Sequence, residues 1–279
     1  MILLADSGST KTDWQLISGK EVVRTLNSEG MNPYFINTNE AEAILLQTFA
    51  DLPETKETEA VFFYGAGCSS PSKQEVIHKA LQKVFPGSHT EVEHDMLAAA
   101  RALFANRPGI PCILGTGSNS CVYDGNQITE SLFSLGYMFG DEGSGAHLGK
   151  TYIADHLKKR APQEIQDAFT TTYGFSDEEI LTNIYNNPNP NRFLASFAPF
   201  IRENLEHPYI NRLAESCFDG FFKEQVTRYD DHRILPMGCI GSVGYHFRHI
   251  IENSARKYGI RAEKFMISPM EGLISYHAV

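Results

Sequence analysis

The chain has 279 residues, more than a single hydrophobic core usually accommodates, which predicts two domains. Its 42% apolar and 21% charged residues are typical of a soluble globular protein and exclude global disorder. A net charge of -10 at pH 7 repels phosphate backbones and anionic lipids, so we expect neither a nucleic acid nor a membrane as partner. Five cysteines without a C-x-x-C motif, and no run of the ~18 apolar residues that a membrane helix needs, predict a reducing compartment, with the cytoplasm as the default.

The first hundred residues read as a β-meander followed by alternating strands and helices. Strands are predicted at residues 2–6, 14–18 and 21–26, with a polar turn at 7–13 and a tight turn at Gly19-Lys20. Further strands are predicted at 60–64 and 89–93, and helices at 41–49, 71–85 and 95–104. A proline- and glycine-bearing break at 106–111 marks the predicted domain boundary.

After this break the chain repeats the strand and turn pattern of its first 26 residues. Strands are predicted at 112–115, 120–123 and 127–133, and the sequence Ile-Leu-Leu-Ala-Asp-Ser-Gly-Ser at 2–9 is echoed by Pro-Cys-Ile-Leu-Gly-Thr-Gly-Ser at 111–118. The spacing of about a hundred residues is too long for a solenoid and predicts two homologous lobes. We assign 1–107 to an N-terminal lobe and 108–268 to a C-terminal lobe, and expect a final helix, about 269–279, to pack back on the first. Residues 146–228 are predicted to be mostly helical, with a strand at 233–239 and a helix at 245–258.

The two glycine-rich turns are the strongest chemical signal. Backbone N–H groups of such turns can wrap phosphate oxygens, although ordinary hairpin turns contain the same residue types. Asp6 enters the first turn, where it is placed to hold a hydrated Mg²⁺, and Lys11 lies on the other side. The P-loop and Rossmann fingerprints both fail on glycine spacing, so a nucleotide would be bound by the paired hairpins.

Four segments, in family order, resemble a known superfamily. Residues 6–12 resemble the first phosphate loop of the actin, hexokinase and Hsp70 superfamily, residues 115–119 its second, and residues 241–244 its adenosine loop. The Gly-Asp-Glu-Gly-Ser segment within 136–144 resembles the signature of N-acetylglucosamine kinases and the related BadF/BadG/BcrA/BcrD ATPases. The resemblance implies an α/β, two-lobed actin-like ATPase (ribonuclease H-like) fold, with mixed sheets flanked by helices and a cleft between the lobes.

The resemblance also implies roles for individual residues. ATP and its phosphates are expected at Ser7, Gly8, Ser9, Thr10, Lys11, Thr116, Gly117, Ser118, Gly241, Ser242 and Gly244, with Mg²⁺ held through water by Asp6. The sugar is expected at Asn32, Gly67, Ser118, Gly140 and Asp141, with Asp95 as the catalytic base. Plainer explanations stay open: Asp95 as a helix N-cap, Asn32-Pro33 as a turn, Asp141-Glu142 as a cap pair, and His94 as a structural residue.

The expected activity is ATP-dependent phosphorylation of an amino sugar, N-acetylglucosamine to its 6-phosphate, by a cytoplasmic homodimer. Glucosamine and N-acetylmuramic acid remain alternatives as substrates. Two other functions stay open on the same fold. One is an ATPase that activates a radical dehydratase or reductase through a shared iron–sulfur cluster, for which Cys121 follows the second loop but the next cysteine is Cys217. The other is a sugar- or ATP-binding sensor without turnover.

Overall fold

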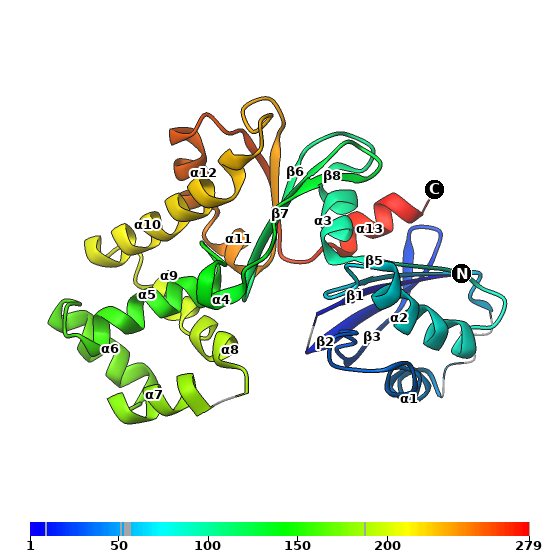
Figure 1. Cartoon of the computed structure of the whole chain (residues 1–279), viewed down its shortest axis with the longest axis horizontal. Helices are drawn as coiled ribbons and strands as arrows, with labels where there is room; N and C mark the ends of the chain where they lie inside the picture. Colours follow the sequence, from blue (N-terminus) through cyan, green and yellow to red (C-terminus); the bar gives the residue numbers. More distant parts are fainter. Residues whose placement is uncertain (9, 51, 53–56, 187, 279) are drawn as a thin grey trace. The chain divides into compact units, whose positions relative to one another are not determined.

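The computed structural model describes residues 1–8, 10–50, 52, 57–186 and 188–278. The chain forms two compact units, of which one comprises Met1–Arg107 with Ser268–Val279 and the other Pro108–Ile267 (Figure 1). Within the described residues no helix has the length and apolar character needed to cross a membrane.

The first unit is built on a five-stranded mixed sheet. Its strands are β1 (Ile2–Ser7), β2 (Lys11–Ser18), β3 (Glu21–Glu29), β4 (Ala60–Gly65) and β5 (His89–His94), in the order β3-β2-β1-β4-β5. The first three form an antiparallel meander, and β4 and β5 continue the sheet parallel to β1.

Helices cover both faces of this sheet, because side chains that alternate along the strands are apolar on both sides. Leu3, Val61 and Phe63 share a core with α1 (Thr38–Phe49) and α2 (Pro71–Val84). The opposite face meets α3 (Asp95–Phe104) and α13 (Met270–His277), which pack against each other (Figure 1). There Phe62 stacks on His277, with ring centroids 3.8 Å apart.

The second unit repeats the same sheet. Its strands are β6 (Ile110–Leu114), β7 (Ser118–Tyr123), β8 (Ile128–Ser131), β9 (Met237–Ile240) and β10 (Ala262–Met266), in the order β10-β9-β6-β7-β8. Again an antiparallel meander is extended by two strands parallel to its first strand. The repeated sequence at the start of each unit therefore corresponds to one sheet topology used twice.

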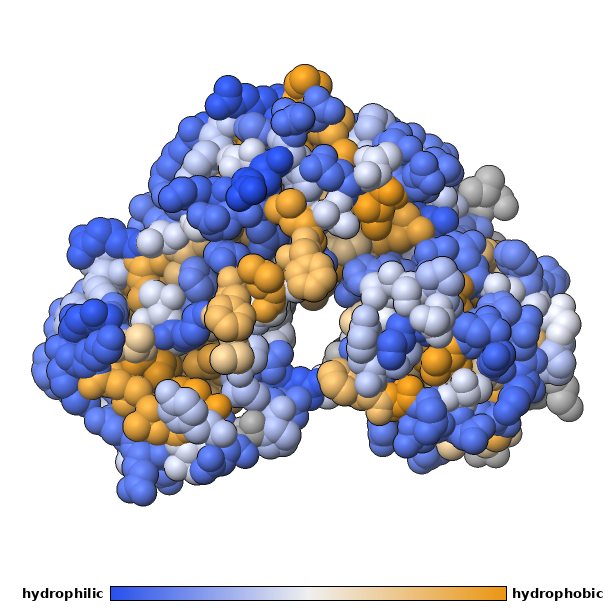
Figure 2. Space-filling model, viewed as in Figure 1, coloured by the Kyte–Doolittle hydropathy of each residue, from blue (hydrophilic) through white to orange (hydrophobic). Residues whose placement is uncertain are grey.

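The second unit is richer in helix. Its helices are α4 (Gly136–Phe139), α5 (Gly145–Leu157), α6 (Gln163–Tyr173), α7 (Asp177–Asn186), α8 (Pro190–Ala195), α9 (Ala198–Glu203), α10 (Pro208–Glu224), the 3₁₀ helix η2 (Val226–Arg228), α11 (Ser242–His246) and α12 (Arg248–Lys257). A buried aromatic cluster joins α5, α6 and α9 through Tyr152, Phe169 and Phe200. Hydrophilic residues cover most of the surface in view, with a hydrophobic patch where α6 and α7 lie (Figure 2).

Both hairpin turns are shorter than the sequence suggests. We predicted a turn at 7–13, but Ser7 belongs to β1 and pairs with Thr12 of β2. Their hydroxyl oxygens lie 2.7 Å apart in the interior, so the strands continue to the tip of the hairpin. Similarly, Ser118 pairs with Leu114 in the second hairpin and belongs to β7.

Two further expectations in the C-terminal part of the chain are wrong, and one strand was not predicted. Residues 233–235 form a turn, in which Ile234 and Leu235 donate to the carbonyl of Asp231, so β9 begins only at Met237. The helix predicted at 245–258 is two helices that meet at Phe247. The strand β10 was not predicted, because Glu263-Lys264 breaks the apolar run that a buried strand would show.

Candidate functional site

The predicted residues of the first unit lie at one edge of its sheet. Ser7 of β1 pairs with Gly65 of β4, and Gly65 pairs with His94 of β5, so the three parallel strands end at the same level. The carboxyl ends of parallel strands are where ligands bind in open α/β sheets. Asp6, on β1, and Asp95, which directly follows β5, therefore lie near the same edge of the sheet.

At the tip of the β1–β2 hairpin, Gly8, Thr10 and Lys11 are exposed, and the Gly8 N–H donates to the carbonyl of Lys11 (3.0 Å). The Ser7 hydroxyl is buried and bonded within the protein, since it also accepts the N–H of Met31 (3.1 Å). The Ser7 hydroxyl is therefore already used within the protein, and the carbonyl of this residue accepts the N–H of Ala66 (2.8 Å). Ser9, which was predicted to bind phosphate, lies outside the described residues.

More negative than positive charge surrounds the carboxylate of Asp6. Burial, followed by the charges of Asp95 and Asp13, raises the pKa of Asp6 to about 7, whereas Lys11 lowers it. The ammonium of Lys11 is paired with Asp13, with Nζ and Oδ2 3.0 Å apart. A partly buried carboxylate in such surroundings suits a hydrated divalent cation, whose charge would favour the ionised form.

Two predicted sugar-binding residues, Asn32 and Gly67, touch each other. Gly67 has a φ of +85°, and a Cβ there would lie 2.3 Å from Oδ1 of Asn32, so only glycine fits beside this amide. Oδ1 of Asn32 also accepts the N–H of Tyr34 (3.0 Å). The Tyr34 ring is exposed, and the Lys73 ammonium lies 4.2 Å from its centroid.

Asp95 is not the N-cap of α3. That position belongs to His94, whose ring accepts the N–H of Met96 (3.2 Å), and Asp95 is the first helical residue. Oδ1 of Asp95 is buried, and Nδ1 of His94 lies 2.9 Å from it. The capping explanation for this carboxylate therefore fails, and the side chain is available for another role.

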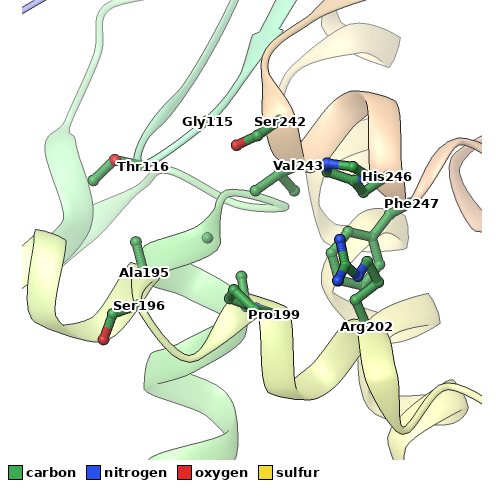
Figure 3. A pocket seen from close by; sticks show the side chains of 12 residues that line it. Gly115, Thr116, Ala195, Ser196, Pro199, Arg202, Ser242, Val243, His246 and Phe247 are labelled. Atoms are coloured by element: carbon green, nitrogen blue, oxygen red, sulfur yellow. The ribbon is translucent and has the colours of Figure 1, made fainter. Parts of the chain in front are cut away.

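In the second unit, a cavity of about 260 Å³ opens at the matching edge of the sheet. It is lined by Gly115, Thr116, Gly145, Ala195, Ser196, Ala198, Pro199, Arg202, Ser242, Val243, His246 and Phe247. Figure 3 shows Thr116 on one side of this cavity and Arg202 and His246 on the other, with Val243 and Pro199 between them. The cavity thus joins the predicted second phosphate loop to the predicted adenosine loop.

Close backbone packing builds this cavity. Gly241 has a φ of +115°, and a Cβ there would lie 2.3 Å from the carbonyl oxygen of Leu114. At Gly244 a Cβ would lie 2.4 Å from Sγ of Cys239. The carbonyl of Gly115 accepts the N–H of Gly145 at the start of α5 (2.8 Å). Gly241 and Gly244 are therefore required for packing at this edge.

A second cavity, of about 210 Å³, lies on another side of the β6–β7 hairpin. Its lining comprises Ser118, Asn119, Leu132, Phe133, Ser134, Leu135, Phe139, Gly140, Asp141, Glu142, Glu224, Gln225 and Arg228. It brings together Ser118, Gly140 and Asp141, which were predicted to bind sugar. Thr116 lines the first cavity and Ser118 the second, so the hairpin contributes to both.

Asp141 is held in an unusual conformation beside this hairpin. Its φ of +58° lies in the left-handed region, which is uncommon for a residue other than glycine and is concentrated at functional sites. Its Oδ1 accepts the N–H of Ser118 (3.3 Å), and a Cβ on Gly117 would lie 3.0 Å from its Oδ2. Burial and then the charge of Glu142 raise the pKa of Asp141, against the hydrogen bond from Ser118 and the charge of Lys150.

Several residues of the two cavities were not predicted from the sequence. Arg202 and His246 line the first, and Gln225 and Arg228 line the second. Apart from His246, which follows the adenosine loop closely, they come from helices far along the chain. No local motif surrounds them, so a single sequence carries no signal for them.

The described residues contain neither a cluster of three metal-binding side chains nor an exposed cysteine. They contain no group of three or more His, Cys, Asp or Glu side chains that could hold a metal ion directly. All five cysteines are buried. Cys121, which raised the possibility of an iron–sulfur activator, is fully buried in β7.

The two mixed sheets of one topology and the hairpins at their edges define an actin-like ATPase fold. Neither a protein-family model nor a curated protein matches the chain. Among solved structures, MreB 5 of Spiroplasma citri bound to AMPPNP is 12% identical, with a TM-score of 0.61, and is covered over 95% of its length by 99% of this chain. A putative N-acetylglucosamine kinase from Chromobacterium violaceum is 18% identical, with a TM-score of 0.72, over 99% of this chain and 98% of that one. At these identities both show the fold alone.

A more similar structure is the putative N-acetylglucosamine kinase of Porphyromonas gingivalis. It is 41% identical and has a TM-score of 0.94, over 100% of this chain and 99% of that one. The chain belongs to the family of this relative, the N-acetylglucosamine kinase-like proteins of the actin-like ATPase fold.

Proposed function

We propose that this protein is an ATP-dependent sugar kinase, and that its substrate is N-acetylglucosamine, phosphorylated at O6. The observation that supports the proposal most directly is the β6–β7 hairpin, which lines one cavity with Thr116 and a second with Ser118. A phosphoryl-transfer enzyme needs adjacent places for donor and acceptor, because catalysis depends mainly on positioning and charge neutralisation. The name of the relative that is 41% identical agrees with this activity.

In this proposal the cavity between Thr116 and Ser242 takes ATP. Backbone N–H groups at the hairpin tip and at the start of α11 face the phosphates. Val243 and Phe247 offer apolar contact for the adenine, and the planar guanidinium of Arg202 can stack on it. In the first unit, the exposed tip at Gly8, Thr10 and Lys11 also binds phosphate.

Asp95 acts as the base in the proposed reaction. While His94 is neutral, the buried Oδ1 of Asp95 can accept the proton of the sugar hydroxyl as the phosphoryl group is transferred. Ser118 and Asp141 in the second unit, and Asn32 beside Gly67 in the first, hold the other sugar hydroxyls. Asp6 would hold Mg²⁺ through water, and the ion would supply neutralisation of the phosphate charge.

The alternative of an iron–sulfur activator is not favoured, because Cys121 is fully buried and the other cysteines are buried as well. A non-catalytic sensor would keep ATP binding and lose sugar-dependent turnover. Turnover therefore separates the sensor from the kinase.

The test is coupled ADP release with Mg-ATP against N-acetylglucosamine, glucosamine, N-acetylmuramic acid and glucose. Asp95→Asn is assayed beside the wild type, and Asp167→Asn, an exposed change on α6, serves as the matched control. We expect a clear preference for N-acetylglucosamine and a turnover about 10²- to 10⁴-fold lower in Asp95→Asn, with unchanged ATP binding by calorimetry.

A folded wild-type protein that binds ATP but shows no sugar-stimulated ADP release would overturn the kinase proposal and favour the sensor. Turnover with a different sugar as the best substrate would retain the kinase and correct the substrate. Equal activity in Asp95→Asn and Asp167→Asn would remove Asp95 from the mechanism.

A further inference from the structure

The N-terminus of α5 holds the tip of the β6–β7 hairpin. The N–H of Gly145, the first residue of α5, donates to the carbonyl of Gly115 (2.8 Å), and the N–H of Ala146 donates to that of Thr116 (3.1 Å). The remaining carbonyl of the tip, on Gly117, accepts the N–H of Gly115 (3.0 Å). All the carbonyl groups between β6 and β7 are therefore used within the protein.

These contacts fix the direction of the N–H groups at the tip. Its peptide bonds are trans, so the carbonyl of one residue and the N–H of the next point in opposite directions. Because the carbonyls of Gly115 and Thr116 face α5, the N–H groups of Thr116 and Gly117 face away from it. Among the described residues neither N–H has an acceptor, whereas the next one, of Ser118, donates to Asp141. The tip thus presents two adjacent main-chain donors and no carbonyl.

Such a tip suits a phosphate group, because a carbonyl oxygen turned toward the ligand would repel its negative charge. Since the N-terminus of α5 carries partial positive charge, its hydrogen bonds polarise the two peptide groups of the tip and strengthen their N–H groups as donors. The helix therefore both orients this pair of donors and increases their attraction for an anion.

The helix approaches the hairpin this closely because residue 145 has no side chain. A Cβ there would lie 3.2 Å from the carbonyl oxygen of Gly115, 3.1 Å from Cβ of Ala195 and 3.4 Å from Cγ2 of Val243. A methyl group would have to displace these neighbours by a few tenths of an ångström, and the Gly115 carbonyl is one of them. The direction of the two donors therefore depends on the glycine at this position.

We propose that Gly145 is a positioning residue for phosphoryl transfer, through which the start of α5 directs the N–H groups of Thr116 and Gly117 toward the phosphates of ATP. The inference rests on the proposed kinase function and adds a role for α5, none of whose residues belongs to the site predicted from the sequence. A misplacement of 1 Å in such a site costs on the order of 10²-fold in rate, so a few tenths of an ångström correspond to about 3- to 10-fold.

Gly145→Ala tests this role. We expect the KM for Mg-ATP to rise about 3- to 10-fold, while the KM for the sugar stays within about 2-fold of the wild type. Gly220→Ala, on α10, is the matched control, because a Cβ there meets only the side chain of Glu142, at an ordinary distance of 3.8 Å. An unchanged KM for ATP in Gly145→Ala, or equal rises in the KM for ATP and sugar, would overturn the inference.

A methyl group at position 145 would also narrow the ATP cavity, which Gly145 lines. Calorimetry with AMP and ATP separates the two effects, because displaced N–H groups weaken contacts to the β- and γ-phosphates, which AMP lacks. We expect the affinity for ATP to fall about 3- to 10-fold and the affinity for AMP to stay near the wild-type value. Equal losses for AMP and ATP would mean that the methyl group obstructs the cavity, and would contradict a positioning role.

A general loosening of α5 is the remaining explanation. Ile153→Val, in the core further along α5, removes a buried methylene and should lower the melting temperature. We expect it to leave the KM for ATP unchanged, and a rise as large as that of Gly145→Ala would overturn the inference. Failure of the proposed function is seen separately, as a wild-type protein without sugar-dependent ADP release.

Discussion

The imidazole Nδ1 of His94 lies 2.9 Å from Oδ1 of Asp95 and 3.2 Å from the N–H of Met96. One nitrogen cannot serve both groups at once, since the N–H of Met96 needs a lone pair and the carboxylate of Asp95 needs a proton. Neutral His94 therefore caps α3, and protonated His94 pairs with Asp95. Burial lowers the pKa of His94, but the hydrogen bond and charge of Asp95, with the charge of Glu93, outweigh it and leave the pKa raised.

This contact predicts a pH dependence of turnover. Below the raised pKa, the imidazolium holds the Asp95 carboxylate that we propose as the base, so kcat/KM should increase as the pH rises through that value. The ion pair stabilises the fold below about pH 6.5, the ordinary histidine value, and this contribution disappears as the pH passes the raised pKa. In His94→Asn, which keeps a good N-cap residue without a titrating ring, the step in the pH–rate profile should vanish. His249→Asn, at an exposed position of α12, is the control, and persistence of the step in His94→Asn would show that another group causes it.

The raised pKa of Asp6 predicts that its ionised carboxylate destabilises the free protein, although the proposed reaction needs this carboxylate. With a pKa of about 7 in the folded protein and 3.8 as the reference, the folded state binds the proton more tightly. The free energy of unfolding contributed by this group is thus present below about pH 4 and lost as the pH rises to about 7, by up to ~4 kcal/mol. Asp6→Asn should therefore be more stable than wild type at pH 8 in the absence of ATP and Mg²⁺, and nearly equal at pH 4.

Urea unfolding at both pH values measures this difference, and the kinase assay should show a loss of Mg-ATP-dependent turnover in Asp6→Asn. Asp167→Asn controls for the loss of one surface charge. A stability difference that does not change between pH 4 and pH 8 would contradict the assignment.

Gly241→Ala should damage the proposed ATP cavity. The new Cβ would lie 2.3 Å from the carbonyl oxygen of Leu114, at a φ of +115° that alanine rarely adopts. We expect a destabilisation of about 1–3 kcal/mol and a larger rise in the KM for ATP than for the sugar. Gly87→Ala is the control, because Gly87 also has a positive φ, of +88°, but a Cβ there meets nothing within 4 Å. Equal KM values for ATP in the two variants would argue against the cavity as the nucleotide site.

Gly272→Ala should loosen α13 from α3. A Cβ on Gly272 would lie 2.5 Å from Cα and from the carbonyl oxygen of Ala102, so the two helices could not remain at their present distance. We expect a loss of about 1–3 kcal/mol in the free energy of unfolding, as is typical of overpacking. Turnover should also fall, because Asp95 is the first residue of α3. Ser275→Ala, at an exposed position of α13, should melt like the wild type. A melting temperature of Gly272→Ala within error of that control would contradict the close helix contact.

Much of the fold follows from local pattern. The meanders at the two starts, the helix at 95–104 and the strands at 60–64 and 89–93 are recognisable because alternation, glycine turns and capping depend on residues close together in the chain. The predictions that failed concern elements whose extent depends on a neighbouring strand. The extension of β1 to Ser7 depends on pairing with Thr12, and β10 is a strand only because β9 lies beside it.

For the candidate site, the hairpin residues could be predicted from the sequence, since Asp6, Thr116 and Ser118 lie in short Gly- and Ser-rich segments whose chemistry is local. Which side chains lie beside them depends on the packing of distant segments. This packing brought Gln225 to Ser118 across 107 positions, and placed Arg202 and Ser242 around one cavity with Thr116. Such contacts depend on how helices pack against a sheet edge, and packing is set by complementary surfaces that no short stretch of sequence contains.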